Sequence, residues 1–331
     1  MSDAPLPSAP DSTRIVVPSR EIPVPAHLSA EAQTVLSMSL FESTPYPALD
    51  DHAAWTEMIT ARDAMLLPMF EAMGSGVVAE VDEIDIDGVA VHVITPEETE
   101  NDEQVVLDFH GGALILGGGA CSRASGMIRA GALRSRIWSV DYRMPPDHPY
   151  PTPLDDCVAA YRSLLEQCRP EDIVVSGGSA GANLAGALVL RARDEGLPLP
   201  GSLVLMTPEL DLTESGDTFH TNLGIDAFLT PLMPVNLLYA DGHDLSHPYL
   251  SPLLGDFERG FPPTFLSSGT RDLFLSNAVR MHQALRAAEV HTELHILEGA
   301  PHGGFMGSAP EDRELNRQTR RFISEAASTK R

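Results

Sequence analysis

The segment 173–190, IVVSGGSAGANLAGALVL, constrains the fold of this chain more than any other part of the sequence. A β-branched run ends at Ser176, small residues fill 177–181, and an alanine- and leucine-rich stretch typical of a helix follows at once. A serine between glycines in such a strand–turn–helix unit adopts a strained backbone that lifts its hydroxyl above the sheet. The segment therefore predicts that Ser179 is a nucleophile at the end of a buried strand.

Short apolar runs alternate with helical patterns along most of the chain, which predicts a mostly parallel sheet with helices on both faces. A hairpin is expected within 77–96, because Asp87-Gly88 separates two alternating halves. The strands expected after it are Gln104–Phe109, Ile137–Tyr142, Ile173–Ser176, Ser202–Met206, Thr264–Ser267 and Thr292–Leu297. The helices expected between and after them lie near 153–167, 180–195, 275–289 and 312–327.

Two regions depart from this rhythm. Residues 1–26 carry six prolines and resemble an arm, after which the apolar spacing is helical to about Gly74. No strand pattern is visible in 211–262, and an insertion of this size between strands is typically a lid or a small subdomain. We therefore expect an N-terminal arm with cap helices (1–50), a first core part (51–210), a cap insertion (211–245) and a second core part (246–331).

The charge of the chain excludes several kinds of partner. The formal net charge is −25, which argues against binding to nucleic acid or to an anionic membrane. The only lysine is Lys330, so neither a P-loop lysine nor a Schiff-base lysine is available inside a domain. The N-terminus lacks an apolar signal sequence, and no run of 18 apolar residues occurs, so a soluble cytoplasmic protein is expected.

No metal or other cofactor is expected. The three cysteines form no CxxC pair, and they are interpreted as small buried apolar residues. His243 and His247 flank Asp244 at a spacing that could place two metal ligands on one helix face. They lack an HExxH motif or further ligands, so we interpret them as solvent-facing residues.

A second glycine-rich segment, VVLDFHGGALILGGG at 105–119, leads directly from a predicted strand into His110-Gly111-Gly112. Two adjacent glycines can direct consecutive backbone N–H groups at one oxygen, which is what an oxyanion hole requires. His110 is expected to support this loop. The alternative, a dinucleotide-binding loop, fails because Ser122 stands where GxGxxG needs its last glycine.

Four motifs in this order resemble the hormone-sensitive-lipase-like branch (bacterial family IV) of α/β-hydrolases: HGG at 110–112, DYRMPPDHPYPTPLDDC at 141–157, GGSAG at 177–181 and PHGGF at 301–305. The resemblance covers roughly residues 75–328. It implies an α/β-hydrolase fold with an eight-stranded, mostly parallel sheet, helices on both faces and a helical cap. It also implies that the oxyanion donors are the backbone N–H groups of Gly111, Gly112 and Ala180.

The chain departs from the family pattern at three places. Ala113 stands where a third glycine is usual, and Gly178 precedes the nucleophile where Asp or Thr is common. The acid motif is reduced to 272–277, DLFLSN, a form similar to the branch that contains monoterpene ε-lactone hydrolases. None of these changes involves a reacting atom, so they concern specificity.

The acid and the base are expected after the last two predicted strands, because this fold places nucleophile, acid and histidine in that chain order. Asp272 follows the run at 264–267, and His302 follows the run at 292–297. Other histidines lie in or beside predicted strands and helices, at His282, His291 and His295. Other aspartates precede the run at 264–267, at Asp241, Asp244 and Asp256.

These residues predict ester hydrolysis through an acyl-enzyme, with His302 as base and Asp272 orienting it. The resemblance favours short to medium acyl esters as small-molecule substrates. A lactone hydrolase, an amidase or a deacetylase would use the same triad, and a non-catalytic binding protein on this fold would have lost the histidine. A homodimer is left open. The residues expected to line the substrate pocket are Leu114, Ile115, Phe219, Phe228 and Met233.

Overall fold

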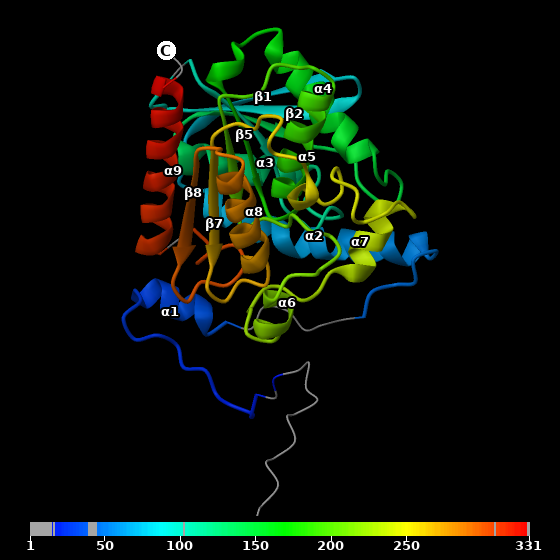
Figure 1. Ribbon diagram of the computed structural model, residues 1–331, viewed down its shortest axis with the longest axis vertical. Coiled ribbons are helices and arrows are strands. Elements are labelled where there is room, and N and C mark those ends of the chain that lie inside the picture. The colour runs from blue at the N-terminus through cyan, green and yellow to red at the C-terminus, as the bar shows by residue number, and fades with distance from the viewer. Residues whose placement is uncertain (1–14, 16, 39–44, 102, 308, 330–331) are drawn as a thin grey trace, which may run out of the picture.

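The computed structural model describes residues 15, 17–38, 45–101, 103–307 and 309–329, so parts of the predicted N-terminal arm lie outside the described residues. Its strands form one sheet in the order β1-β2-β4-β3-β5-β6-β7-β8 (Figure 1). Their bounds are β1 Ala79–Ile86, β2 Val89–Pro96, β3 Val105–Phe109, β4 Arg136–Val140, β5 Ile173–Gly178, β6 Ser202–Met206, β7 Thr264–Gly269 and β8 Thr292–Leu297. The eight-stranded sheet predicted from the sequence is confirmed.

The sheet is antiparallel at one edge and parallel elsewhere. β1 and β2 form the predicted hairpin around Asp87-Gly88, and β2 pairs antiparallel with β4. All pairs from β4 through β3, β5, β6 and β7 to β8 are parallel. Because parallel strands end at the same edge of a sheet, the loops that follow β3, β5, β6, β7 and β8 all reach one edge.

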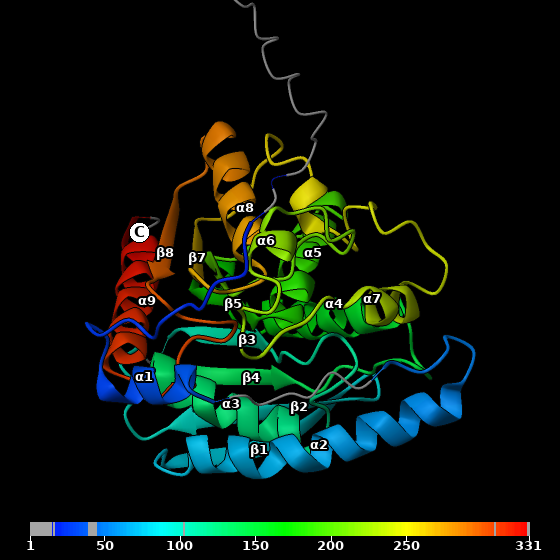
Figure 2. The same ribbon diagram turned by 90° about the horizontal axis from the view of Figure 1, so that it is seen from below.

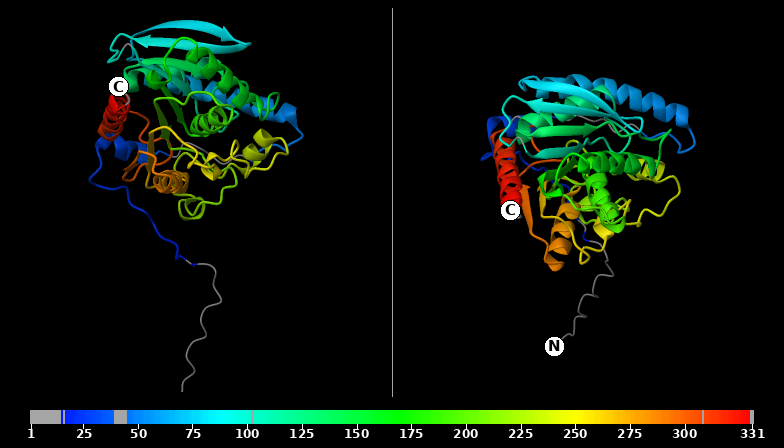
Figure 3. Two further views of the ribbon diagram at one scale, coloured as in Figure 1. Left: turned by 45° about the horizontal axis from the view of Figure 1, so that its top comes forward. Right: turned by 90° about the horizontal axis from the view of Figure 1, so that it is seen from above.

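Helices cover both faces of the sheet, as Figure 2 and Figure 3 show. The alternation along β3 separates the two cores, because Val106 faces one core while Val105 and Leu107 face the other. The first core is closed by α3 (Ala120–Leu133) and α9 (Pro310–Thr329). The second is closed by α4 (Thr152–Leu165), α5 (Ala180–Asp194) and α8 (Leu275–Ala287).

α3 is a helix that the sequence patterns considered above do not predict. Its residues, ACSRASGMIRAGAL, include two glycines, which disfavour a helix in isolation. Both glycines are sites of close packing: a Cβ on Gly126 would lie 2.6 Å from Ile94 Cδ1, and one on Gly131 would lie 2.5 Å from Val77 Cγ2. Tertiary packing therefore overrides the local preference.

The N-terminal helices and the insertion pack around the loops at the carboxyl edge of the sheet. α1 (Ala30–Leu36) and the residue Leu28 before it pack against the loop after β8. The cluster joins Leu28, Ala32 and Val35 to Ala300 and Phe305. The first turn of α2 (His52–Gly74) contributes Trp55 to a separate cluster with insertion residues. In the insertion lie α6 (Thr218–Thr221) and α7 (Met233–Ala240), followed by a 3-10 turn at Pro252–Leu254. The described part of 211–262 contains no strand, as predicted.

Within the described residues, no helix combines the length and the apolar character needed to cross a bilayer.

Candidate active site

Ser179 occupies a sharp turn between β5 and α5 with φ 55° and ψ −121°, a conformation that a non-glycine residue rarely adopts. The glycines on either side make this turn sterically feasible. A Cβ on Gly177 would lie 2.2 Å from the Gly181 carbonyl oxygen, and a Cβ on Gly181 would lie 1.9 Å from the Phe109 carbonyl oxygen. The GxSxG spacing is thus a packing requirement between β3, β5 and α5.

Ser179, His302 and Asp272 form a continuous hydrogen-bonded chain. Nε2 of His302 lies 2.9 Å from Oγ of Ser179, and Nδ1 of His302 lies 3.1 Å from Oδ1 of Asp272. The three side chains come from loops that follow β5, β8 and β7, so they meet because these strands are parallel. The structure therefore brings together all three residues expected from the sequence.

The Asp272 carboxylate is fully buried and held on both oxygens. Oδ2 accepts a hydrogen bond from the Ser268 hydroxyl at 2.7 Å, and Oδ1 accepts one from the Phe274 N–H at 2.9 Å. Burial opposes a charge on His302, but the Asp272 carboxylate outweighs it and raises the pKa of His302 above its ordinary value of 6.5. The carboxylate thus stabilises the imidazolium that forms when His302 takes a proton.

Three backbone N–H groups are candidates for holding an oxyanion. A Cβ on Gly111 would lie 3.1 Å from the Gly178 carbonyl oxygen, so the loop after β3 passes close to the nucleophile turn. Gly112 has φ +128°, and a Cβ there would lie 2.1 Å from the Leu116 carbonyl oxygen. Ala180 is the first residue of α5, where N–H groups lack a partner within the helix.

His110 lies beneath this loop, away from the triad. Its ring is buried, its Nδ1–H donates to the Gly111 carbonyl at 2.8 Å, and it stacks on Tyr142 with ring centroids 4.1 Å apart. The Tyr142 hydroxyl donates to the His110 carbonyl at 2.7 Å. Ala113 and Leu114 both have positive φ, so this loop holds two non-glycine residues in the left-handed region.

Two buried carboxyl groups beside the triad have no signal in the sequence motifs. Asp226, in the insertion, accepts hydrogen bonds from the Leu273 N–H at 2.8 Å and the His302 N–H at 3.3 Å. It therefore connects the loop after β7 with the loop after β8. Glu209 follows β6, and its N–H donates to the Ser179 carbonyl at 3.3 Å. Burial raises the pKa of Glu209 to about 8, so its side chain is neutral at pH 7.

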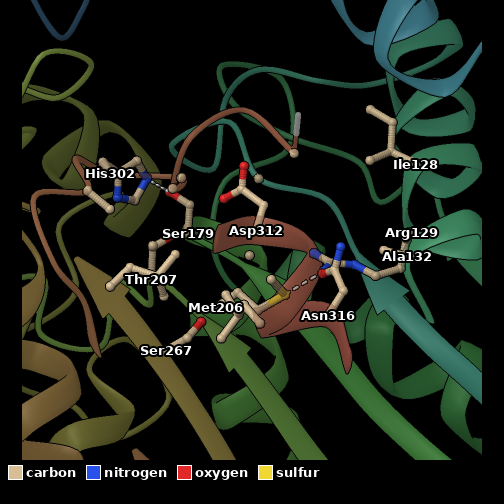
Figure 4. A pocket seen from close by; sticks show the side chains of 18 of the residues that line it. Ile128, Arg129, Ala132, Ser179, Met206, Thr207, Ser267, His302, Asp312 and Asn316 are labelled. Carbon is tan, nitrogen blue, oxygen red and sulfur yellow. Dashed lines mark hydrogen bonds between the residues drawn. The ribbon is translucent and has the colours of Figure 1, made fainter. Parts of the chain in front are cut away.

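A cavity with a volume of about 240 Å³ opens beside Ser179 and His302 (Figure 4). Its walls come from the glycine loops, from the ends of β6 and β7, and from α3 and α9. The side chains that line it include Ile128, Arg129, Met206, Asp312, Leu315 and Asn316.

None of the five residues expected to line the pocket lines this cavity, and four of them pack against neighbouring elements instead. Leu114 is buried in the main core, and Ile115 in the cluster around Trp55. Phe219 packs on Phe274 with ring centroids 5.7 Å apart. Phe228 packs on the cluster around α1, and Met233 begins α7.

The histidine pair considered as a metal site has no helical geometry. His243 and His247 lie in turns after α7. His243 Nδ1 contacts the Ala240 carbonyl at 2.8 Å, and His247 Nδ1 accepts from the Tyr249 N–H at 3.1 Å. Among the described residues, no group of three or more metal-ligating side chains is found.

The chain is similar to esterases in sequence. It is 34% identical over 200 residues to an esterase of Acinetobacter venetianus, which is 59% of this chain and 66% of that protein. It is 35% identical over 186 residues to an acetyl-hydrolase of Streptomyces hygroscopicus, which is 55% of this chain and 62% of that protein. The matched region is thus slightly less than two thirds of each relative.

Solved structures match over almost the whole chain. The crystal structure of esterase E25 has a TM-score of 0.87 at 34% identity and covers 95% of this chain and 99% of its own. An esterase from the bacterial hormone-sensitive lipase family has a TM-score of 0.74 at 27% identity, covering 90% and 99%. Residues 106–306 match the model of a family described by the alpha/beta hydrolase fold. The chain therefore belongs to this alpha/beta hydrolase family, in which it resembles the bacterial hormone-sensitive lipase esterases.

Proposed function

We propose that the chain is a serine carboxylester hydrolase that cleaves short to medium acyl esters through an acyl-enzyme on Ser179. The observation that carries this proposal is the hydrogen-bonded chain Asp272–His302–Ser179, of which Ser179 and His302 line a cavity. A serine hydroxyl is a weak nucleophile until a base removes its proton, and the 2.9 Å contact to His302 supplies that base. The esterase relatives support the same reaction class.

The mechanism follows from the geometry of the site. Ser179 Oγ attacks the ester carbonyl while His302 Nε2 takes its proton, and the buried Asp272 carboxylate stabilises the resulting imidazolium. We assign the N–H groups of Gly111, Gly112 and Ala180 to the developing oxyanion. His302 then protonates the leaving alcohol, and a water activated by His302 releases the acid from Ser179.

The size of the cavity supports the acyl preference. A volume of about 240 Å³ is at or below the lower end of ordinary ligand sites, which span roughly 300–1,000 Å³. We also propose that the N-terminal helices and 211–245 form a substrate-selecting cap. The cluster of Trp55 with Phe219 and Leu232 supports this, because it joins α2 to the insertion.

A series of p-nitrophenyl esters with acyl chains of two to twelve carbons tests the proposal. We expect kcat/KM to be greatest among the short chains and to fall beyond the length that the cavity accommodates. Faster turnover of the twelve-carbon ester than of the four-carbon ester would contradict the assignment of the cavity. A lactone panel beside the series tests the similarity to ε-lactone hydrolases, which stays a prediction.

A further inference from the structure

The cavity beside Ser179 is largely apolar, but polar side chains lie in the wall formed by α3 and α9. Figure 4 shows Arg129 and Asn316 on the side of the cavity away from His302. The hydrolytic reaction proposed above uses neither residue. The inference below rests on that proposed function and concerns the part of the substrate that enters this cavity.

Arg129 is held in place from below by the sheet. Its Nε lies 3.2 Å from Oδ1 of Asp108, an aspartate on β3 whose side chain is only 1% exposed. Its Nη1 contacts the sulfur of Met206 at the end of β6 (Figure 4). The guanidinium is therefore fixed by two strands, and its remaining amino group is the part available to the cavity.

That amino group lies next to the nucleophile turn. A Cβ on Gly178 would be 3.4 Å from Nη2 of Arg129, so the missing side chain before Ser179 leaves this donor uncovered. A side chain at 178 would contact this amino group.

Asn316, on α9, supplies a second polar group to the same cavity. No hydrogen bond from its amide or from Nη2 of Arg129 is found within the described residues, and neither group is among the buried atoms without a partner, so solvent reaches both donors. An acyl group that fills the cavity removes solvent from them, and a ligand oxygen that accepts from them restores the hydrogen bonds that are lost.

The charge of this wall indicates which kind of ligand oxygen it would bind. The positive charge of Arg129 is matched by Asp108, and the chain has a formal net charge of −25. The wall therefore offers N–H donors without a net positive charge, which favours a neutral acceptor over a carboxylate.

We propose that this cavity selects esters whose acyl group carries a neutral oxygen function, a ketone or hydroxyl, a few bonds beyond the ester carbonyl. Arg129 and Asn316 are the specificity-determining residues, and they donate to that oxygen while Ser179 attacks the carbonyl. Hydrocarbon acyl groups of the same shape enter the cavity but leave both donors unpaired.

The test compares p-nitrophenyl 4-oxopentanoate with p-nitrophenyl 4-methylpentanoate, which have the same number of acyl heavy atoms. The measured quantity is the ratio of their kcat/KM values in each variant relative to the wild type, since this comparison cancels intrinsic reactivity. We expect the ratio to fall about tenfold in the double variant Asp108→Leu/Arg129→Met, which removes the buried pair together. Asn316→Leu should lower it about threefold, as for one neutral hydrogen bond.

Arg123→Met is the matched control, because Arg123 lies on the same helix α3 but is exposed. It should leave the ratio unchanged. If the double variant fails to fold, the ratio measured for Asn316→Leu alone decides whether the inference holds. An unchanged ratio in Asn316→Leu and in any folded double variant, with 4-methylpentanoate still hydrolysed, would overturn the inference. Preference for the carboxylate ester mono-p-nitrophenyl glutarate over the 4-oxo ester would also overturn it. If the wild type hydrolysed none of the esters, that result would contradict the proposed function instead.

Discussion

The turn at Ser179 and the insertion at 211–245 both contact the proposed catalytic groups, but different interactions fix their positions. The turn depends on backbone contacts: only glycine fits at 177 and 181, because the carbonyl oxygens of neighbouring elements occupy the Cβ positions. The insertion depends on buried carboxylates, such as Asp211, which pairs with Arg280 at 2.7 Å, and Asp226, which accepts from the His302 N–H. Both kinds of contact join residues far apart in the sequence. The turn is nevertheless marked by the GxSxG pattern within five residues, whereas no local pattern marks the carboxylates of the insertion.

Gly181→Ala tests the turn and should have the largest effect. Its Cβ would lie 1.9 Å from the Phe109 carbonyl oxygen, so β3 or α5 must move to admit it. We expect poor yield of folded protein, a melting temperature lower by on the order of 10 °C, and more than about a hundredfold loss of kcat/KM because the turn shifts. Gly76→Ala is the control, because Gly76, like Gly181, has no positive φ but has open space around it. Equal stability of the two variants would show that packing in the turn is unimportant.

Asp226→Asn tests the insertion. The amide cannot accept on both sides as the carboxylate does, so the loops that carry Leu273 and His302 should lose part of their alignment. We expect kcat to fall about tenfold with little change in KM, as expected for a misplaced base. Asp217→Asn, on an exposed residue of the same insertion, should retain wild-type kinetics. A wild-type kcat in Asp226→Asn would mean that Asp226 plays no part in positioning.

Glu209→Gln should give the smallest effect, and that effect depends on pH. The folded protein holds the Glu209 pKa at about 8, above the ordinary 4.5, so wild-type stability falls as the pH rises from about 4.5 to 8. Glutamine removes this titration. We expect matching melting temperatures near pH 5 and a variant more stable by on the order of 5 °C at pH 9. A constant difference across the pH range would show that Glu209 does not titrate in this interval.

The difference between the two regions also explains how much could be predicted from the sequence. Ser179, Asp272 and His302 each follow a predicted strand, and parallel strands end together, so their meeting follows from chain order and alternation. α3 was not foreseen, because its glycines disfavour a helix and only packing against Ile94 and Val77 explains them. The position of Arg129 in the cavity wall depends on α3, so it could not be predicted from the sequence.

Pairings across long sequence distances leave no local pattern. Asp226 accepts a hydrogen bond from His302, 76 positions away in the sequence. Ser268 lies at the end of a strand, and nothing in the sequence indicates that its hydroxyl donates to Asp272. The five residues expected in the substrate pocket do not line this cavity, and the reason is related: an apolar side chain in a cap can pack on its neighbours or face the substrate, and the sequence pattern is the same in both cases.

Covalent labelling of Ser179 tests the central claim most directly. An organophosphate should react stoichiometrically with the wild type and abolish p-nitrophenyl butyrate hydrolysis, and mass spectrometry should find one adduct on the peptide that contains Ser179. Ser179→Ala should take up no label and lose activity by about 10⁴-fold or more, with an unchanged circular dichroism spectrum. Labelling at another residue, or activity of folded Ser179→Ala above about a hundredth of the wild-type rate, would contradict the assignment of Ser179 as the nucleophile.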